Sequence, residues 1–88
     1  MTEQDVFLPR LGWQAAGEGT WRLQTQDGYV LQVDEIRRDR YRWACLGPGP
    51  ERRMDVGYVN GSLWYAEGDA ELALWEQRRH GGRKAVRA

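Results

Sequence analysis

The side chains that could act as nucleophiles or general bases are few and lie far apart in the sequence. His80 is the sole histidine and Cys45 the sole cysteine of the 88 residues. His80 directly precedes Gly81-Gly82 at the expected end of a helix, where a positive charge stabilises the helix dipole. Cys45 falls on the apolar face of an expected strand, and buried thiols without basic neighbours are unreactive. We therefore expect no catalytic pair built on either residue.

Metal and phosphate ligands are equally scarce. One cysteine and one histidine cannot assemble a zinc site, and the acids Glu67, Asp69 and Glu71 lack the spacing of a calcium loop. Gly17, Gly19, Gly28 and Gly61 fall at expected turns, so they form no phosphate cradle. Gly47 and Gly49 alternate with prolines, which have no N–H donor. The sequence predicts a protein that is not an enzyme and that uses no cofactor or metal.

Nucleic acid is an alternative partner, because the net charge of zero conceals segregated segments. Residues 36–54 hold six bases and two acids, and residues 77–88 hold five bases and no acid. Twelve of the 13 bases are Arg, which contacts phosphate and guanine in a bidentate manner. Whether the basic segments meet depends on the fold. The candidate contact residues are Arg37, Arg38, Arg40, Arg78, Arg79, Arg83 and Lys84.

The first half of the chain has the alternation of antiparallel hairpins. Strands are expected at 13–16, at 20–25, from Tyr29 onward and at 40–46, with turns at 17–19, 26–28 and 37–39. A two-residue Asp27-Gly28 turn would set Leu23 against Gln32. A three-residue loop with Gly28 left-handed pairs Leu23 with Leu31 instead. Because a one-residue slip reverses every side chain, the apolar alternation predicts the longer loop.

This register gives the predicted sheet one apolar and one polar face, which is typical of an antiparallel sheet covered on one side. Asp34 and Arg42 are expected opposite each other on the polar face. The polar face also holds Gln14, Arg22, Gln24 and Gln32, and the apolar face holds Trp13, Ala15, Trp21, Leu23, Tyr29, Leu31, Val33, Tyr41, Trp43 and Cys45.

The second half of the chain is expected to form one more hairpin and a helix. Asn60-Gly61 is a strong hairpin signal and predicts strands at 53–59 and 62–66. A helix is expected at 69–80, capped by Asp69 and ended by Gly81-Gly82. The predicted fold is an α+β antiparallel meander of about five strands, with one C-terminal helix packed on its apolar face. We expect a single domain over 1–88, with an irregular segment at 1–12 and a flexible basic tail at 83–88.

The cellular setting follows from what the sequence lacks. A single cysteine permits no internal disulfide, which favours an intracellular protein. The N-terminus has neither the basic start nor the apolar stretch of a signal peptide, and no apolar run approaches the ~20 residues of a membrane span. We expect a soluble cytoplasmic protein without membrane contact.

Surplus apolar surface predicts a protein partner. The expected second hairpin carries apolar residues on both faces, and the helix is apolar around much of its circumference, yet one helix layer covers only one face. The cover could be residues 1–12, with Phe7, Leu8 and Leu11, or another protein. A second copy is the most available partner, which predicts a homodimer. The predicted interface residues are Trp64, Trp75, Leu72 and Val59.

The nucleic-acid alternative yields the first testable prediction. If phosphate contacts carry the affinity, charge reversal at Arg37 and Arg38 weakens binding by a similar factor for every sequence and flattens its salt dependence. Fluorescence anisotropy with labelled duplex and single strands, at low and moderate salt, measures both effects. No binding at low salt would refute this alternative.

Overall fold

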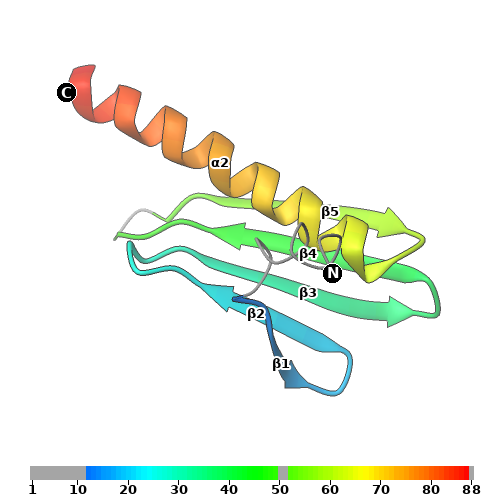
Figure 1. Cartoon of the computed structure of the whole chain (residues 1–88). Coiled ribbons are helices and arrows are strands. Elements are labelled where there is room, and N and C mark those ends of the chain that lie inside the picture. Colours follow the sequence, from blue (N-terminus) through cyan, green and yellow to red (C-terminus); the bar gives the residue numbers. More distant parts are fainter. Residues whose placement is uncertain (1–11, 50–51, 88) are drawn as a thin grey trace, which may run out of the picture.

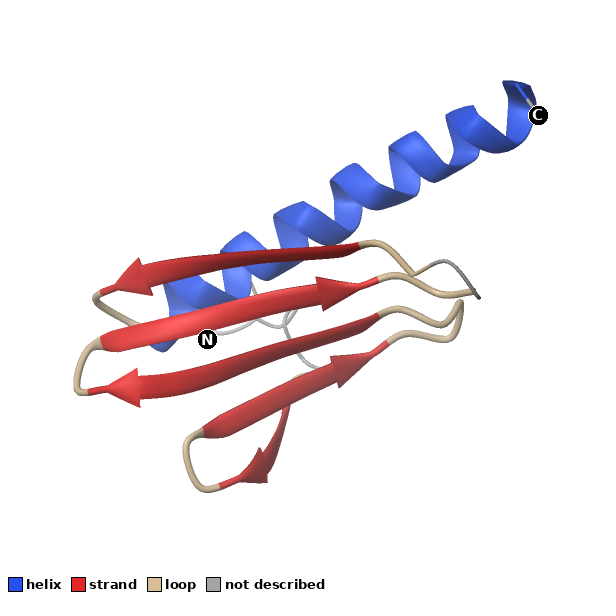
Figure 2. Ribbon diagram, turned by 180° about the vertical axis from the view of Figure 1, so that it is seen from behind, coloured by secondary structure: helices blue, strands red, loops and turns tan. Residues whose placement is uncertain are grey.

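The computed structural model describes residues 12–49 and 52–87, and the side chains of 12–49 and 52–80. Within these residues, five strands form one antiparallel sheet in chain order, and one helix follows them. Figure 1 shows the helix running along one face of the sheet, and Figure 2 shows the opposite face, which no described element covers. The α+β meander predicted from the sequence is confirmed. The elements are β1 (Gln14–Gly17), β2 (Thr20–Gln24), β3 (Val30–Arg37), β4 (Arg40–Leu46), β5 (Met54–Asn60) and α2 (Leu63–Arg87).

The β2–β3 hairpin has the predicted three-residue loop. Leu23 lies opposite Leu31, and Gly28 has a φ of 97°. The amide of Thr25 donates to the Tyr29 carbonyl at 3.0 Å, and the Gly28 amide donates to the Thr25 carbonyl at 3.1 Å. Glycine adopts this left-handed conformation without the steric cost that a Cβ would add. The apolar alternation therefore overrides the two-residue turn that Asp-Gly favours in isolation.

The β3–β4 pairing also follows the predicted register, with Leu31 opposite Cys45 and Asp34 opposite Arg42. The turns at 17–19 and 37–39 are tighter than expected, because Gly17 and Arg37 join their strands. A β-bulge beside each of these residues accommodates one extra residue. The side chains of the adjoining strands therefore stay on the predicted faces of the sheet.

The predicted hairpin around Asn60-Gly61 is wrong, because residues 62–66 are not a strand. β5 ends at Asn60 and α2 begins at Leu63. The hydroxyl of Ser62 accepts a hydrogen bond from the Tyr65 amide at 3.3 Å, so Ser62 caps the helix. Gly61 has a φ of 127°, and its amide donates to the Asp39 carbonyl at 2.7 Å, which fixes the turn from strand to helix.

The predicted bounds of the helix are therefore also corrected. Asp69 lies in the second turn of α2 rather than at its cap, and Gly81-Gly82 does not end the helix, which continues to Arg87. A helical glycine costs about 1 kcal/mol relative to alanine, which disfavours the helix without breaking it. Figure 1 shows the C-terminal part of α2 extending beyond the sheet.

The core lies between α2 and the middle strands. Leu31, Cys45 and Ala70 are fully buried, and the core cluster also contains Tyr29, Ala73 and Leu74. Trp13, Leu23 and Trp43 pack against its rim. Burial raises the pKa of the Cys45 thiol to about 11, and the nearby Asp55 carboxylate adds to this rise. The thiol is therefore protonated near neutral pH.

Strand β5 pairs with β4 and carries a glycine where a side chain would meet a large ring. Gly57 lies opposite Trp43, and a Cβ added to Gly57 would lie 2.5 Å from Cζ2 of that ring. The indole therefore lies across Gly57 on the helix side of the sheet.

We expect Gly57→Ala to lower the free energy of unfolding by about 1–3 kcal/mol, because the added methyl forces the Trp43 ring out of place. Urea unfolding followed by circular dichroism measures the loss. The control is the same substitution in a Trp43→Leu background, where it should cost much less. An equal cost in both backgrounds would show that the ring contact is not the cause.

Candidate interaction surfaces

Large apolar side chains are exposed mainly on two elements, β5 and α2. Within the described part of the chain, Ile36 on β3 is the exception to this distribution. The β5 residues point to the open face of the sheet, whereas the α2 residues lie along the helix. The exposed set is Ile36, Met54, Val56, Tyr58, Trp64, Tyr65, Leu72 and Trp75.

The outward face of α2, defined here by Trp64, Gly68, Leu72, Trp75 and Arg79, points away from the sheet. Successive residues turn by roughly 100° around a helix, so this spacing of three and four keeps them on one side. The buried alanines of α2 lie on the opposite side. Trp64 is 43% exposed, Leu72 58% and Trp75 51%. The guanidinium of Arg79 lies 4.4 Å from the centre of the Trp75 ring, a cation–π contact.

Three of the four predicted interface residues, Trp64, Leu72 and Trp75, therefore lie on one exposed surface, but Val59 does not. Val59 lies opposite Tyr41 on the helix side of the sheet and is half-buried. The predicted position of Val59 beside Trp64 depended on a strand at 62–66. Because that segment is helical, this pairing does not form.

A groove of about 460 Å³ separates β5 from α2. The apolar part of its lining comes from Trp43, Leu72 and Ala73, and Val56, whose side chain points to the open face, borders it along β5. The charged part comes from three acids and one base: Asp55, Asp69, Glu76 and Arg53. This groove was not predicted from the sequence, since it depends on β5 pairing with β4 beneath the helix.

Gln77 orients α2 over the sheet and was not recognised from the sequence. Its side-chain amide is buried and donates to the Cys45 carbonyl at 3.1 Å and to Oδ2 of Asp55 at 3.0 Å. A buried amide without such partners would cost about 1–3 kcal/mol. Its spacing from Ala70, Ala73 and Leu74 is the signal that could have placed it on the buried side.

The candidate nucleic-acid residues do not form one patch. Arg37, Arg38 and Arg40 surround the β3–β4 turn, whereas Arg78 binds Asp27 in the β2–β3 loop at the other end of β3. Eight residues of strand separate these ends by roughly 25 Å. Arg79 is on the outward face of α2, and the side chains of Arg83 and Lys84 lie outside the described residues.

The residues considered for catalysis and metal binding are also apart. His80 contacts Glu76 at 3.4 Å on the helix surface, whereas Cys45 is in the core. Among the residues with described side chains, no three His, Cys, Asp or Glu are arranged to hold a metal ion. Within residues 12–49 and 52–87, no helix combines the length and apolar character needed to cross a bilayer.

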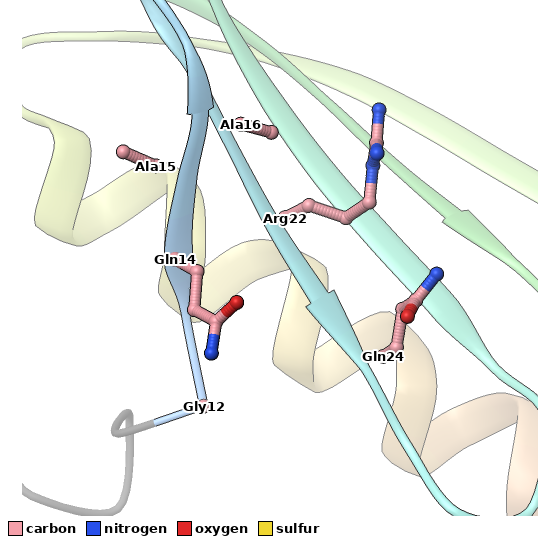
Figure 3. A pocket seen from close by; sticks show the side chains of 6 residues that line it. All are labelled: Gly12, Gln14, Ala15, Ala16, Arg22 and Gln24. Carbon is pink, nitrogen blue, oxygen red and sulfur yellow. The ribbon is translucent and has the colours of Figure 1, made fainter.

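A second hollow, of about 250 Å³, lies beside β1 and β2 (Figure 3). Gln14, Arg22 and Gln24 supply its polar lining, and Gly12, Ala15 and Ala16 complete it. Arg22 already donates to Oε1 of Gln32 at 2.9 and 3.1 Å. The lining offers amide and guanidinium groups.

Comparison with known proteins gives one distant relative. The chain is 27% identical over 67 residues to a protein of Dictyostelium discoideum named "Probable serine/threonine-protein kinase pats1". The match covers 73% of this chain but 2% of that protein. No family model matches the chain, and no solved structure matches it significantly.

The ion pair between Arg78 and Asp27 generates a prediction about acid stability. The hydrogen bonds from Arg78, and a further one with Thr25, lower the pKa of Asp27 from 3.8 to about 2. A carboxyl whose pKa falls on folding stabilises the protein above its unfolded pKa, and this contribution is lost as the pH falls towards 2. As the pH is lowered from about 5 to about 2, we expect the free energy of unfolding to fall less in Asp27→Asn than in wild type.

Urea unfolding at several pH values measures this difference. Glu18→Gln, in the β1–β2 turn, is the matched control and should retain the wild-type acid dependence. The same acid dependence in Asp27→Asn and wild type would contradict the role of this pair.

Proposed function

We propose that the chain is a non-enzymatic protein-binding module that pairs with a second copy of itself through the outward face of α2. The observation that carries the proposal is the exposure of Trp64, Leu72 and Trp75 along one side of the helix. Burying a large apolar side chain contributes on the order of 2–3 kcal/mol, and Trp is often found at the energetic centre of interfaces. Residues 1–11, the alternative cover, lie outside the described residues.

The charge distribution along α2 favours an antiparallel pair of helices. The N-terminal part of the helix is acidic, whereas its last ten residues are basic. An antiparallel arrangement sets the acidic part of each helix against the basic part of the other, whereas a parallel one sets like charges together. The acids are Glu67, Asp69, Glu71 and Glu76, and the bases are Arg78, Arg79, Arg83, Lys84 and Arg87.

The geometry of α2 also suits a two-fold pair. An antiparallel pair is isologous, so one patch meets itself and the assembly closes at two copies. Gly68, seven residues before Trp75, leaves room for a large ring on the same helix face. Figure 1 shows the C-terminal part of α2 extending past the sheet, where it can reach a second helix.

Light scattering behind a sizing column tests the proposal. We expect a mass near twice 10.2 kDa for wild type, falling to the monomer for Trp75→Ala. The fold should survive the substitution, because half of the Trp75 side chain is exposed. Salt should weaken the dimer only moderately, since the apolar contact is unscreened.

Tyr58→Ala is the matched control, because it removes an exposed ring from the open face of the sheet and should leave the mass unchanged. A wild-type protein that stays monomeric at millimolar concentration would refute self-pairing. A dimer that persists in Trp75→Ala would place the interface elsewhere.

A further inference from the structure

Strand β5 forms one edge of the sheet, and its outward backbone groups can be identified. The Gly47 amide donates to the Arg53 carbonyl, and the Gly61 amide donates to the Asp39 carbonyl. Both bonds follow the register of the β4–β5 ladder, in which hydrogen-bonded positions alternate. The odd-numbered residues of β5 therefore bond to β4, and the N–H and C=O groups of Met54, Val56 and Tyr58 point outward.

An outward row of backbone donors and acceptors can accept another strand. Proteins often protect long edge strands with proline, lysine or a bulge. β5 runs for seven residues, contains neither proline nor lysine, and pairs with β4 without a register shift. No strand within residues 12–49 and 52–87 pairs with its outer edge. This edge is therefore open to an added strand.

The groove between β5 and α2 determines what the added side chains would meet. Side chains of an added strand alternate between the two faces of the sheet. Those on the helix side enter the groove, whose floor includes the Trp43 ring lying over Gly57. Those on the open side lie next to Met54, Val56 and Tyr58.

The charged side chains that line the groove indicate which kind of strand would bind there. Three acids line it, Asp55, Asp69 and Glu76, against the single base Arg53, which already pairs with Asp55 at 3.4 Å. Basic side chains on the helix side of the added strand would complement this excess of acid. A second β5 in the same place would bring two acidic grooves together, and facing like charges oppose that pairing.

We infer that β5 binds an extended peptide segment in which basic residues alternate with apolar ones, added to the sheet as a sixth strand. The backbone of Met54, Val56 and Tyr58 supplies the hydrogen bonds. The carboxylates of Asp69 and Glu76 on α2 select the basic side chains. This site is distinct from the outward face of α2, although Leu72 borders both, and it does not depend on self-pairing.

Titration with a synthetic peptide of alternating Lys and Val, capped at both ends, tests the inference. In two-dimensional NMR spectra, we expect the largest chemical-shift changes at residues of β5 and at residues that line the groove. Hydrogen exchange should slow at the amides of Val56 and Tyr58. The same peptide with Glu in place of Lys should not bind.

Charge and backbone contributions are separated by matched variants. Asp69→Asn combined with Glu76→Gln should weaken binding roughly tenfold at low salt, because two surface charge pairs are lost. Glu18→Gln, near the opposite edge of the sheet, should leave it unchanged. Val56→Pro removes an outward N–H without removing a bond to β4 and should abolish binding, whereas Val56→Ala should retain it.

Several outcomes would overturn the inference. These are equal binding of the Glu peptide, unchanged affinity of the double variant, and shifts confined to the outward face of α2. If Val56→Pro disrupts folding, the test depends on amide hydrogen exchange in the wild type. Exchange rates at Val56 and Tyr58 that the peptide does not slow would then rule out strand addition. A wild-type dimer that Val56→Pro dissociates and Trp75→Ala leaves intact would make the occupant a second copy.

Discussion

Helix α2 packs on the sheet largely through small residues. Ala66, Ala70 and Ala73 are buried, whereas the large rings of the helix lie elsewhere on its surface. Beneath it, Leu31 and Cys45 are fully buried in the inner layer, and the rings of Tyr29 and Trp43 pack beside them. Close approach lets one helix cover the middle of the sheet. It also places the tryptophans of the helix on the outside, because a ring on the alanine side would separate the two layers.

Polar contacts determine where α2 lies on this apolar surface, which alone permits many orientations. Gln77 bonds to the Cys45 carbonyl and to Asp55, which positions the helix over β4 and β5. On the other flank, Glu71 accepts a hydrogen bond from the Trp13 indole at 2.7 Å, and Arg78 binds Asp27. The buried Gln77 amide penalises alternative placements most, since losing its partners would leave a polar group unsatisfied in the core. The groove beside β5 is the space that this placement leaves.

The two proposed contact surfaces follow from this arrangement and would bind through different interactions. The outward face of α2 offers aromatic area and a charge gradient along the helix. The β5 edge offers backbone hydrogen bonds and a groove lined by acids. The relative in Dictyostelium discoideum matches over only 2% of its length, so the likeness gives no support for kinase activity in this chain.

The sequence by itself determined the first four strands, because one-sided apolar alternation leaves one register that keeps Leu23, Leu31 and Cys45 on the same face. It also identified Leu72 and Trp75 as surplus apolar residues of the helix, since one helix cannot bury its whole circumference. Trp64 was identified as surplus too, but on a strand at 62–66 that does not form. Only the tertiary structure decided that residues 62–66 are helical. The Ser62 cap and the bond from Gly61 to Asp39 outweigh the local preference of Asn60-Gly61 for a hairpin. The β5 edge and its groove likewise arise from contacts between segments far apart in the chain, and such contacts leave no periodic signal in the sequence.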